Sequence, residues 1–404
     1  MNHSMENLFN SIQDFKSDLT INHWIVAIIV LIIGLSSSTV LIFETTRLLK
    51  IPTDAASSWL GALCLAMGIL GVYLSLKFKM PILIAWSTAG SALLITTVEH
   101  YSLNEVIGAF IMSALITLAC SLTGLFEKIM NIIPKSIASA LLAGTLLQFS
   151  LKTFGLLNDH LLLVVMMFMV FIFSKKLIPQ LTMLLVVLIG IIHSWHSNLI
   201  DFTLLSFKPT ELHFTSPEFS LSALMSMSIP LFIITLASQN ITGFTLLKNN
   251  GFNPPVSKIM NAVASTNILT SFFGGFILNM SALASAIALG PDSHKDPSKR
   301  YCAGVTTGLL YILVGGLAGT ITSLFAIFPE QLIKAIAGFA LLNTIFVSLK
   351  SAFHNTTDSN DAAFITFIIA ASQFKIFSIG PAFWAILIGL LINWIYHLKL
   401  FKRA

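Results

Sequence analysis

A chain of 404 residues in which 56% of the residues are hydrophobic and only 10% are charged has too little polar surface to coat a water-soluble globule. This composition excludes a soluble globular protein and indicates an integral, all-α membrane protein. The formal net charge of +5 is the charge that basic loops facing an anionic lipid leaflet would give, so it needs no nucleic-acid partner to explain it.

Residues 1–22 form a polar N-terminal segment without the cleavage pattern of a signal peptide. Within it, apolar residues recur at helical spacing: Leu8, Phe9, Ile12, Phe15 and Leu19. This pattern is typical of a helix that lies on the membrane surface. A flexible tail is the alternative for the same residues.

Breaks at charged and turn-forming clusters divide the following residues into about fourteen apolar segments. A membrane-spanning helix needs roughly 20 residues, and all but two short segments are close to that length. The first seven are predicted near 23–43, 57–76, 81–97, 104–126, 136–153, 157–174 and 177–195. A long loop, 196–220, follows them. The second seven are predicted near 221–242, 256–273, 276–290, 301–326, 332–350, 360–374 and 376–397, and a basic tail covers 398–404.

The Lys and Arg residues provide an independent test of this arrangement, because cytoplasmic loops carry an excess of them. If the N-terminus is cytoplasmic and every segment crosses, sixteen of the 22 Lys and Arg residues lie inside and six lie outside. The asymmetry supports the number of segments and places both ends of this chain in the cytoplasm. The 196–220 loop is then external.

An internal duplication is visible when 31–50 is aligned with 232–251, since the two stretches share five identities, among them Ser37 with Ser238. One further span and then a short polar segment follow each stretch. The short segments contain PILIAWSTAGSALL in the first half and GGFILNMSALASAI in the second. Because each half has seven spans, an odd number, we expect two repeats of inverted orientation, 23–195 and 221–397.

The two short segments, the third and the tenth, carry helix breakers and hydroxyl groups at membrane depth. Backbone groups cannot stay unsatisfied in lipid, so broken helices occur only where protein or water surrounds them. A helix that begins inside the membrane directs free N–H groups and a partial positive charge into such a cavity. We therefore predict two half-helices that meet at an anion site, with donors from Ser87, Thr88, Ser91, Asn279, Ser281 and Ser285. The alternative is that these small polar residues only pack helices together.

Several motifs together resemble the benzoate/proton symporter family: AWSTAG at 85–90, SQNITG at 238–243, NNGFNPP at 249–255 and FGGFILNMSALASAIALGP at 273–291. That family is similar to nucleobase and sulfate carriers, which have a seven-plus-seven inverted-repeat fold. The resemblance implies a bacterial inner membrane location, and no cofactor, metal or catalytic residue. It also implies a gate domain and a core domain, the core formed by the spans within 23–97, 104–126, 221–290 and 301–326.

By the same resemblance, we expect a secondary active transporter that moves an aromatic carboxylate, with benzoate as the first candidate, in symport with protons by alternating access. An anion channel, or a carrier of another small organic anion or of a nucleobase, is the alternative. A membrane enzyme is disfavoured, because the sequence contains no HExxH, GxSxG or GxxxxGK[ST] pattern. The expected partners are the substrate, protons and the lipid bilayer, and a homodimer is left open.

One departure from the nucleobase carriers concerns charge: Gln239 stands where they place a glutamate on the eighth span, and no acid lies near Asn279. A buried glutamate would repel a carboxylate, whereas an amide would accept one, so the exchange favours an anionic substrate. The nearest acid is Glu44, which is the candidate proton-coupling residue. Its alternative role is an ion pair with Arg47, three residues on, in which case a protonated aromatic acid would itself carry the proton.

The candidate substrate-binding residues come from the first and eighth spans and from the two broken segments. Trp86 stands beside a predicted half-helix, where its ring would stack on an aromatic substrate. The complete predicted set is Ser37, Ser38, Trp86, Ser87, Thr88, Ser91, Gln239, Asn240, Gly275, Phe276, Asn279 and Ser281.

Overall fold

The computed structural model of the chain describes residues 2–126, 134–354, 359–372, 376 and 379–397. The first half contains α1 (Asn2–Asp18), α2 (Ile21–Leu48), α3 (Thr53–Phe78), β1 (Ile84–Trp86), α4 (Thr88–Thr97), α5 (Leu103–Leu122), α7 (Lys135–Gly155), α8 (Leu161–Leu177) and α9 (Thr182–His196). The second half contains α10 (Leu221–Ala223), α11 (Ile229–Thr235), α12 (Ile241–Asn249), α13 (Val256–Ser271), β2 (Leu278–Met280), α14 (Ala282–Ala288), α15 (Tyr301–Gly316), α16 (Ala318–Ala326), α17 (Glu330–Ala352), α18 (Ser359–Ala371) and α19 (Pro381–His397). The predicted basic tail, 398–404, lies outside the described residues.

Each apolar segment predicted from the sequence coincides with a helix, a helical run, or a strand followed by a short helix, in the predicted order. By length and composition alone, seven helices in the described ranges are long and apolar enough to cross a membrane. An eighth span results if α15 and α16 are counted together, although the two are bent by 62°. The chain is therefore a polytopic helical membrane protein.

The bend between α15 and α16 differs from the prediction, which treated 301–326 as one continuous span. The long loop between the halves explains the break, because Thr210 N donates to Gly316 O at 3.0 Å and Thr210 Oγ1 donates to Gly315 O. These bonds replace the helical partners that the two carbonyl groups lose. A loop distant in sequence thus decides where this helix turns.

Each of several contacts between helices has a counterpart in which the corresponding segments of the two halves are interchanged. The contact of α3 with α15 matches that of α5 with α13, and the contact of α8 with α9 matches that of α18 with α19. In the same way, α2 contacts α4 as α12 contacts α14. This pairing confirms two repeats of seven segments.

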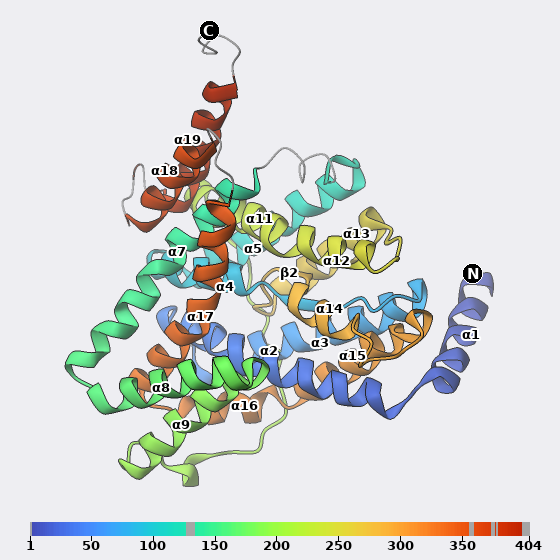
Figure 1. The fold of residues 1–404 in the computed structure, drawn as a ribbon, viewed down its shortest axis with the longest axis horizontal. Coiled ribbons are helices and arrows are strands. Elements are labelled where there is room, and N and C mark those ends of the chain that lie inside the picture. Colours follow the sequence, from blue (N-terminus) through green and yellow to red (C-terminus); the bar gives the residue numbers. More distant parts are fainter. Residues whose placement is uncertain (1, 127–133, 355–358, 373–375, 377–378, 398–404) are drawn as a thin grey trace.

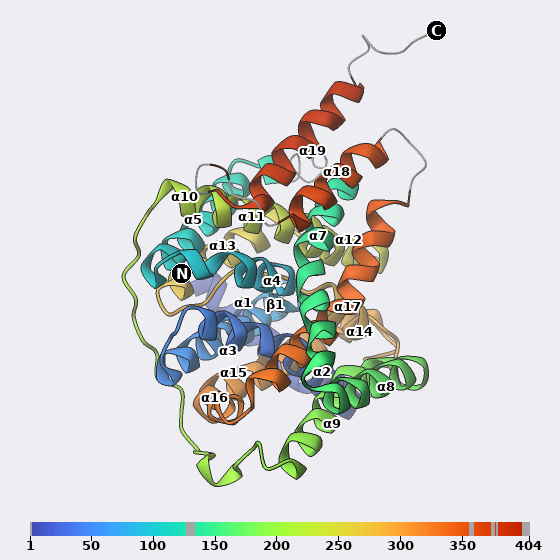
Figure 2. The same cartoon turned by 90° about the vertical axis from the view of Figure 1, so that its left-hand side faces the viewer.

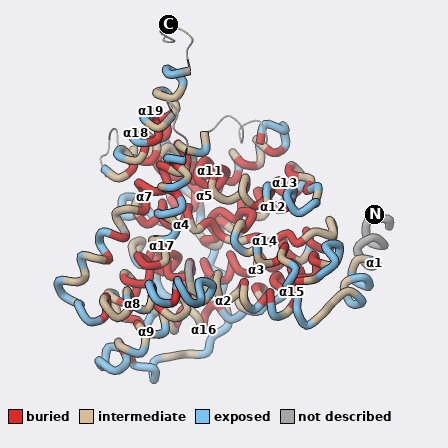
Figure 3. Tube along the Cα trace, in the orientation of Figure 1, coloured by how far each residue is buried: buried red, intermediate tan, exposed pale blue. Residues whose placement is uncertain are grey.

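The helices form two groups, as the core and gate domains require. Helices α2 to α5 and α10 to α16 surround the strands, and α7 to α9 pack with α17 to α19. In Figure 1 the gate helices lie to the left and at the top, while α3, α13 and α15 of the core lie to the right. Figure 3 shows buried residues concentrated in the interior of the molecule and exposed residues along its outer edges. Much of the exposed outer surface is apolar, as on Leu161, Leu188 and Trp394, which suits contact with lipid.

Near the centre of the molecule, β1 and β2 pair antiparallel, with Ala85 opposite Asn279 (Figures 1 and 2). Two more bonds extend the ladder, from Ser87 N to Ile277 O at 2.9 Å and from Ser281 N to Leu83 O at 2.8 Å. The unwound segments therefore satisfy each other's backbone groups inside the protein. A short helix follows each strand, which confirms the predicted half-helices in segments 3 and 10.

The turn that leads into β2 requires glycine at position 274. Gly274 has φ +84, and a Cβ atom there would lie 1.9 Å from Trp59 Cδ1. Since Trp59 is itself buried against Phe110, with ring centroids 5.7 Å apart, the ring has no space to move. The backbone of the second broken segment is thus held against α3.

The N-terminal segment contains α1, which lies at the edge of the molecule (Figure 1). Asp14 pairs with Lys79 at 3.0 Å and Asp18 pairs with Lys299 at 3.1 Å, so α1 is attached to residues next to α3 and α15. Its position on the membrane surface stays a prediction.

Candidate substrate site

The N-terminus of α4 is the first component of the site. Ser87 caps the helix, because its hydroxyl accepts a hydrogen bond from Gly90 N at 2.9 Å. The same hydroxyl lies 3.1 Å from Thr235 Oγ1 on α11, so its capacity is used inside the protein. The N–H groups of Thr88 and Ala89 have no carbonyl partner within the helix. Both of these residues line a cavity.

A small cavity of about 100 Å³, here named the central pocket, lies where the two broken segments meet. Apolar residues form most of its wall, with Ile33, Leu83 and Leu283 among them. No charged side chain from the described residues lines it. Its polar or aromatic lining consists of Ser38, Trp86, Thr88, Gln239, Ser281, Thr307 and Tyr311.

A second cavity of about 560 Å³, the Lys175 cavity, adjoins the central pocket. The two share six lining residues, Ile33, Ser38, Thr88, Gln239, Leu283 and Ile287. Core helices α2, α4 and α14 form one wall of the Lys175 cavity, and gate elements α8, α9 and α17 form the other. The central pocket is therefore reached from between the two domains.

Gln239 is placed by a π-helical turn, Leu236–Asn240, which interrupts the run from α11 to α12. A π-turn inserts an extra residue and redirects the side chains around it, and such turns are frequent at functional sites. Gln239 lines both the central pocket and the Lys175 cavity. The neighbouring Asn240 is buried, and its Oδ1 accepts a hydrogen bond from Met280 N at 3.0 Å. One amide of this turn thus faces the cavity and the other holds β2.

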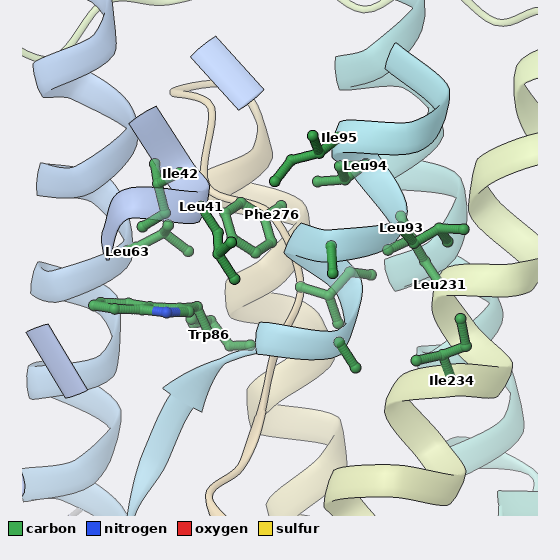
Figure 4. Close-up of a cluster of buried hydrophobic side chains, with 14 of the residues drawn as sticks. Leu41, Ile42, Leu63, Trp86, Leu93, Leu94, Ile95, Leu231, Ile234 and Phe276 are labelled. Carbon is green, nitrogen blue, oxygen red and sulfur yellow. The ribbon is translucent and has the colours of Figure 1, made fainter. Parts of the chain in front are cut away.

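Trp86 forms an aromatic wall of the central pocket. Its ring meets Tyr311 edge to face, with centroids 6.3 Å apart. Figure 4 shows Trp86 reaching from β1 toward Leu63, while Leu93 on α4 lies beside Leu231. Only 3% of Trp86 is exposed, so the ring is fixed by packing before any ligand binds.

The other predicted residues of the broken segments support the site without lining any of its cavities. Ser91 Oγ donates to Ser87 O at 3.0 Å within α4. Asn279 is fully buried; with its amide oriented to satisfy both ends, Nδ2 donates to Met280 O at 2.9 Å and Oδ1 accepts from Ser87 N at 3.1 Å. Phe276 packs on Phe110, with centroids 6.1 Å apart.

Two further predictions concern Gly275 and Ser37. A Cβ atom at Gly275 would lie 2.7 Å from Thr270 Cβ, so this glycine allows the turn after α13 to close. The side chain of Ser37 lies outside the described part of the structure. Its neighbour Ser38 lines the pocket, with Oγ 3.2 Å from Thr88 Oγ1.

Sequence reasoning did not include Tyr311 and Gly34, which face each other across the pocket wall. A Cβ atom at Gly34 would lie 2.3 Å from the Tyr311 hydroxyl oxygen, so the glycine makes room for the phenol. That hydroxyl forms no hydrogen bond with a described residue. A glycine four residues before Ser38, on the same face of its span, was the available signal for Gly34. Nothing local in the sequence indicates which face Tyr311 presents.

A third cavity of about 710 Å³, the Glu44 cavity, lies at the opposite end of α4, where Ile95 and Thr97 contribute to its wall. Glu44 accepts two hydrogen bonds from Arg47, at 2.9 Å and 2.7 Å. Arg47 also pairs with Glu330 at 2.8 Å, which links α2 of the core to α17 of the gate. The ion pair that the spacing of Glu44 and Arg47 suggested is therefore present.

Inverted repeats whose broken helices meet at a pocket between two domains define a class of membrane transporter. Solved structures share this fold. The transmembrane domain of a cyanobacterium bicarbonate transporter, BicA, aligns with a TM-score of 0.61 at 12% identity, covering 92% of this chain and 96% of that one. The overall structure of SLC26A9 aligns with a TM-score of 0.60 at 12% identity, covering 95% of this chain and 67% of that one.

The sequence profile of a single family, described as benzoate membrane transport protein (BenE), matches residues 17–395, and the chain belongs to that family. "Inner membrane protein YdcO" from Escherichia coli is 36% identical over 358 residues, which cover 89% of this chain and 91% of that protein. "Benzoate membrane transport protein" from Acinetobacter baylyi is 31% identical over 380 residues, which cover 94% of this chain and 96% of that protein.

Proposed function

We propose that this membrane transporter carries an aromatic carboxylate, with benzoate as the first candidate, across the bacterial inner membrane in symport with protons. The observation that carries the proposal is the central pocket, which combines donors at the start of a half-helix with an amide and has no acidic side chain among the described residues that line it. The names of the relatives from Acinetobacter baylyi and Escherichia coli support benzoate and the inner membrane respectively.

The pocket suits a single aromatic ring that carries one negative charge. An apolar cavity of about 150 Å³ is large enough to bind benzene, and the central pocket of about 100 Å³ opens into the larger Lys175 cavity. The free N–H groups of Thr88 and Ala89 and the positive end of the α4 dipole would hold the carboxylate. The ring would then lie against Trp86 and the apolar wall.

Alternating access is supported by the unequal connection of the two large cavities to the pocket. The Lys175 cavity shares lining residues with the central pocket, whereas the Glu44 cavity shares none. Lys175 belongs to the predicted cytoplasmic side, so this arrangement corresponds to a state open to the cytoplasm. Movement of the core against the gate would connect the pocket to the Glu44 cavity instead.

The substitution Gln239→Glu tests the anion site. Two like charges about 4 Å apart repel by about 4 kcal/mol at an effective dielectric of about 20, which exceeds the roughly 0.3 to 2 kcal/mol that a helix end supplies. We expect Gln239→Glu to bind benzoate much more weakly than the parent at about pH 7.5, with the difference narrowing toward about pH 5.5 as the new acid takes up a proton.

The measurement is equilibrium binding of labelled benzoate to the purified protein. The same change at Gln13, an exposed position of α1 that lines none of the three cavities, is the control and should leave affinity unchanged. Unchanged affinity in Gln239→Glu across this pH range would show that Gln239 does not face the anion. Uptake into proteoliposomes that fails to saturate would indicate a channel instead of a carrier.

Glu44 is our candidate for the proton-coupling residue, since it is a buried acid on a core helix and lines the Glu44 cavity. Glu44 accepts two hydrogen bonds from Arg47, so coupling requires that protonation of Glu44 separate the pair. Glu44→Gln should then retain benzoate exchange between equal pools and lose accumulation driven by a proton gradient. If Glu44→Gln and Arg47→Gln both retain proton-driven accumulation, the protonated acid itself carries the proton.

A further inference from the structure

Lys175, near the end of α8, is a cation in the wall of a cavity that leads to the central pocket. It is the only charged residue among the described residues that line the Lys175 cavity. Its Nζ lies 5.3 Å from the ring centroid of Phe171 and 5.9 Å from that of Phe346, so two aromatic rings hold the ammonium group. Lys175 forms no ion pair with any described residue.

The same wall contains a buried hydroxyl group that has no hydrogen-bond partner in the described part of the chain. Thr182, at the start of α9, is 6% exposed, and its Oγ1 bonds to no described residue. Buried polar groups are normally hydrogen-bonded, so an unsatisfied one beside a cavity points to a ligand or water that completes it. Asn343 and Ser348 on α17 add polar side chains to this wall, and Phe171 adds an apolar surface.

We propose that this wall is a second binding position for the carboxylate substrate, on the gate side of the Lys175 cavity. The Lys175 ammonium group pairs with the carboxylate, Thr182 donates to it, and the ring lies against Phe171. This inference rests on the proposed function, since it assumes that a small organic anion passes through the cavity. The second position collects anions near the central pocket and receives them when they leave it.

The adjacent Lys176 is a control that distinguishes a binding role of Lys175 from a general role of basic residues at the cytoplasmic side. Both lysines satisfy the cytoplasmic excess of positive charge equally well. Lys176 does not line the Lys175 cavity, although it is the next residue of the same helix. A role limited to membrane orientation therefore predicts equal effects of the two substitutions, whereas a binding role predicts an effect at Lys175 alone.

The experiment measures binding of labelled benzoate to the purified full chain at low and high salt, for the parent, Lys175→Gln and Lys176→Gln. We expect two binding phases in the parent, and in Lys175→Gln a weakened second phase with the tighter phase retained. Relative to the parent at the same salt concentration, Lys175→Gln should lower the affinity of the weaker phase about tenfold or more at 0.01 M salt and by less than about twofold at 1 M, because the Debye length shrinks from about 30 Å to about 3 Å. Lys176→Gln should match the parent at both concentrations.

Two further variants keep the result independent of folding. Lys175→Arg keeps the charge and should retain the weaker phase. Thr182→Val replaces the hydroxyl by a methyl group of similar size, and it should weaken that phase without changing the tighter one. If Lys175→Gln and Lys176→Gln bind benzoate indistinguishably, the second binding position is wrong and the proposed function still stands. A parent protein that binds no benzoate in either phase overturns both.

Discussion

The two broken segments are related by the internal repeat, but the structure gives their capping serines different tasks. Ser87 caps α4, is fully buried, and shares its hydroxyl with Thr235. Ser281 caps α14 by accepting from Ala284 N at 3.2 Å, and it lines the central pocket. The helices differ as well, since α4 has ten residues and α14 has seven. The longer half-helix is fixed by its cap, while the shorter one exposes its cap to the cavity.

The chain also reaches the two strands by different routes. Lys79, with φ 52, ends α3 in a left-handed conformation before Pro81 and β1. In the second repeat Gly274, with φ +84, makes the turn directly against the ring of Trp59. The second strand is therefore anchored by close packing, and the first by a turn whose side chain remains free to pair with Asp14. The turns that lead into the two strands thus need not tolerate the same substitutions.

The largest expected effect tests the anchoring of the second segment. Gly274→Ala combines left-handed strain of about 1 to 2 kcal/mol with overpacking of about 1 to 3 kcal/mol against Trp59. Gly251→Ala is the matched control, because Gly251 has φ +85 and no atom within 4 Å of the added Cβ. Thermal unfolding in detergent should show a clearly larger loss for Gly274→Ala. Equal losses would mean that strain alone, and not the contact with Trp59, limits position 274.

A smaller effect is expected at the wall that Ser281 shares with Gly34 and Tyr311. Gly34→Ala should cost about 1 to 3 kcal/mol of stability, since its Cβ overlaps the phenol oxygen. Tyr311→Phe should relieve the clash, because the added Cβ lies 3.6 Å from Cζ, an ordinary contact distance. We therefore expect the double variant to be more stable than Gly34→Ala. If the losses of stability of the two single variants add up in the double variant, the contact between the two positions is contradicted.

The smallest expected difference separates the two caps themselves. Ser87→Ala leaves Gly90 N and the Thr235 hydroxyl without a partner and should lower stability by about 1 to 2 kcal/mol. Ser281→Ala removes a cap that is partly open to the pocket, so it should affect benzoate binding more and stability less. Unfolding midpoints and benzoate dissociation constants measured for both variants check this. Equal changes in both quantities would remove the distinction between the caps.

The sequence by itself determined the membrane class, the order of the segments, the inverted repeat and the two breaks. Each of these depends on local chemistry that a window of residues reveals. Long apolar runs cannot be covered by water, and Pro81 with the hydroxyl groups of AWSTAG stands out where a spanning helix would be apolar. The Glu44–Arg47 pair was also a local pattern, because residues three apart are neighbours on the surface of a helix.

The tertiary structure alone decided which polar residues face the central pocket. Ser38, Trp86, Thr88, Gln239 and Ser281 reach it. Five equally suggestive residues, Ser91, Asn240, Gly275, Phe276 and Asn279, support the strands and α4 from outside the described cavities. Their tasks depend on partners that lie far along the chain, such as Met280 for Asn240.

Three further features were also decided by the tertiary structure: the position of Tyr311, the bend after Gly316 and the π-turn at Gln239. Gly34 makes room for Tyr311, Thr210 supplies the bonds that let α15 end, and the position of Gln239 depends on a turn that no residue pattern marked. The physical reason is that a buried polar group takes whichever partner the packed neighbours present. Sequence periodicity shows that a hydroxyl or amide is buried, and only the packed helices decide whether it bonds to the protein or faces the central pocket.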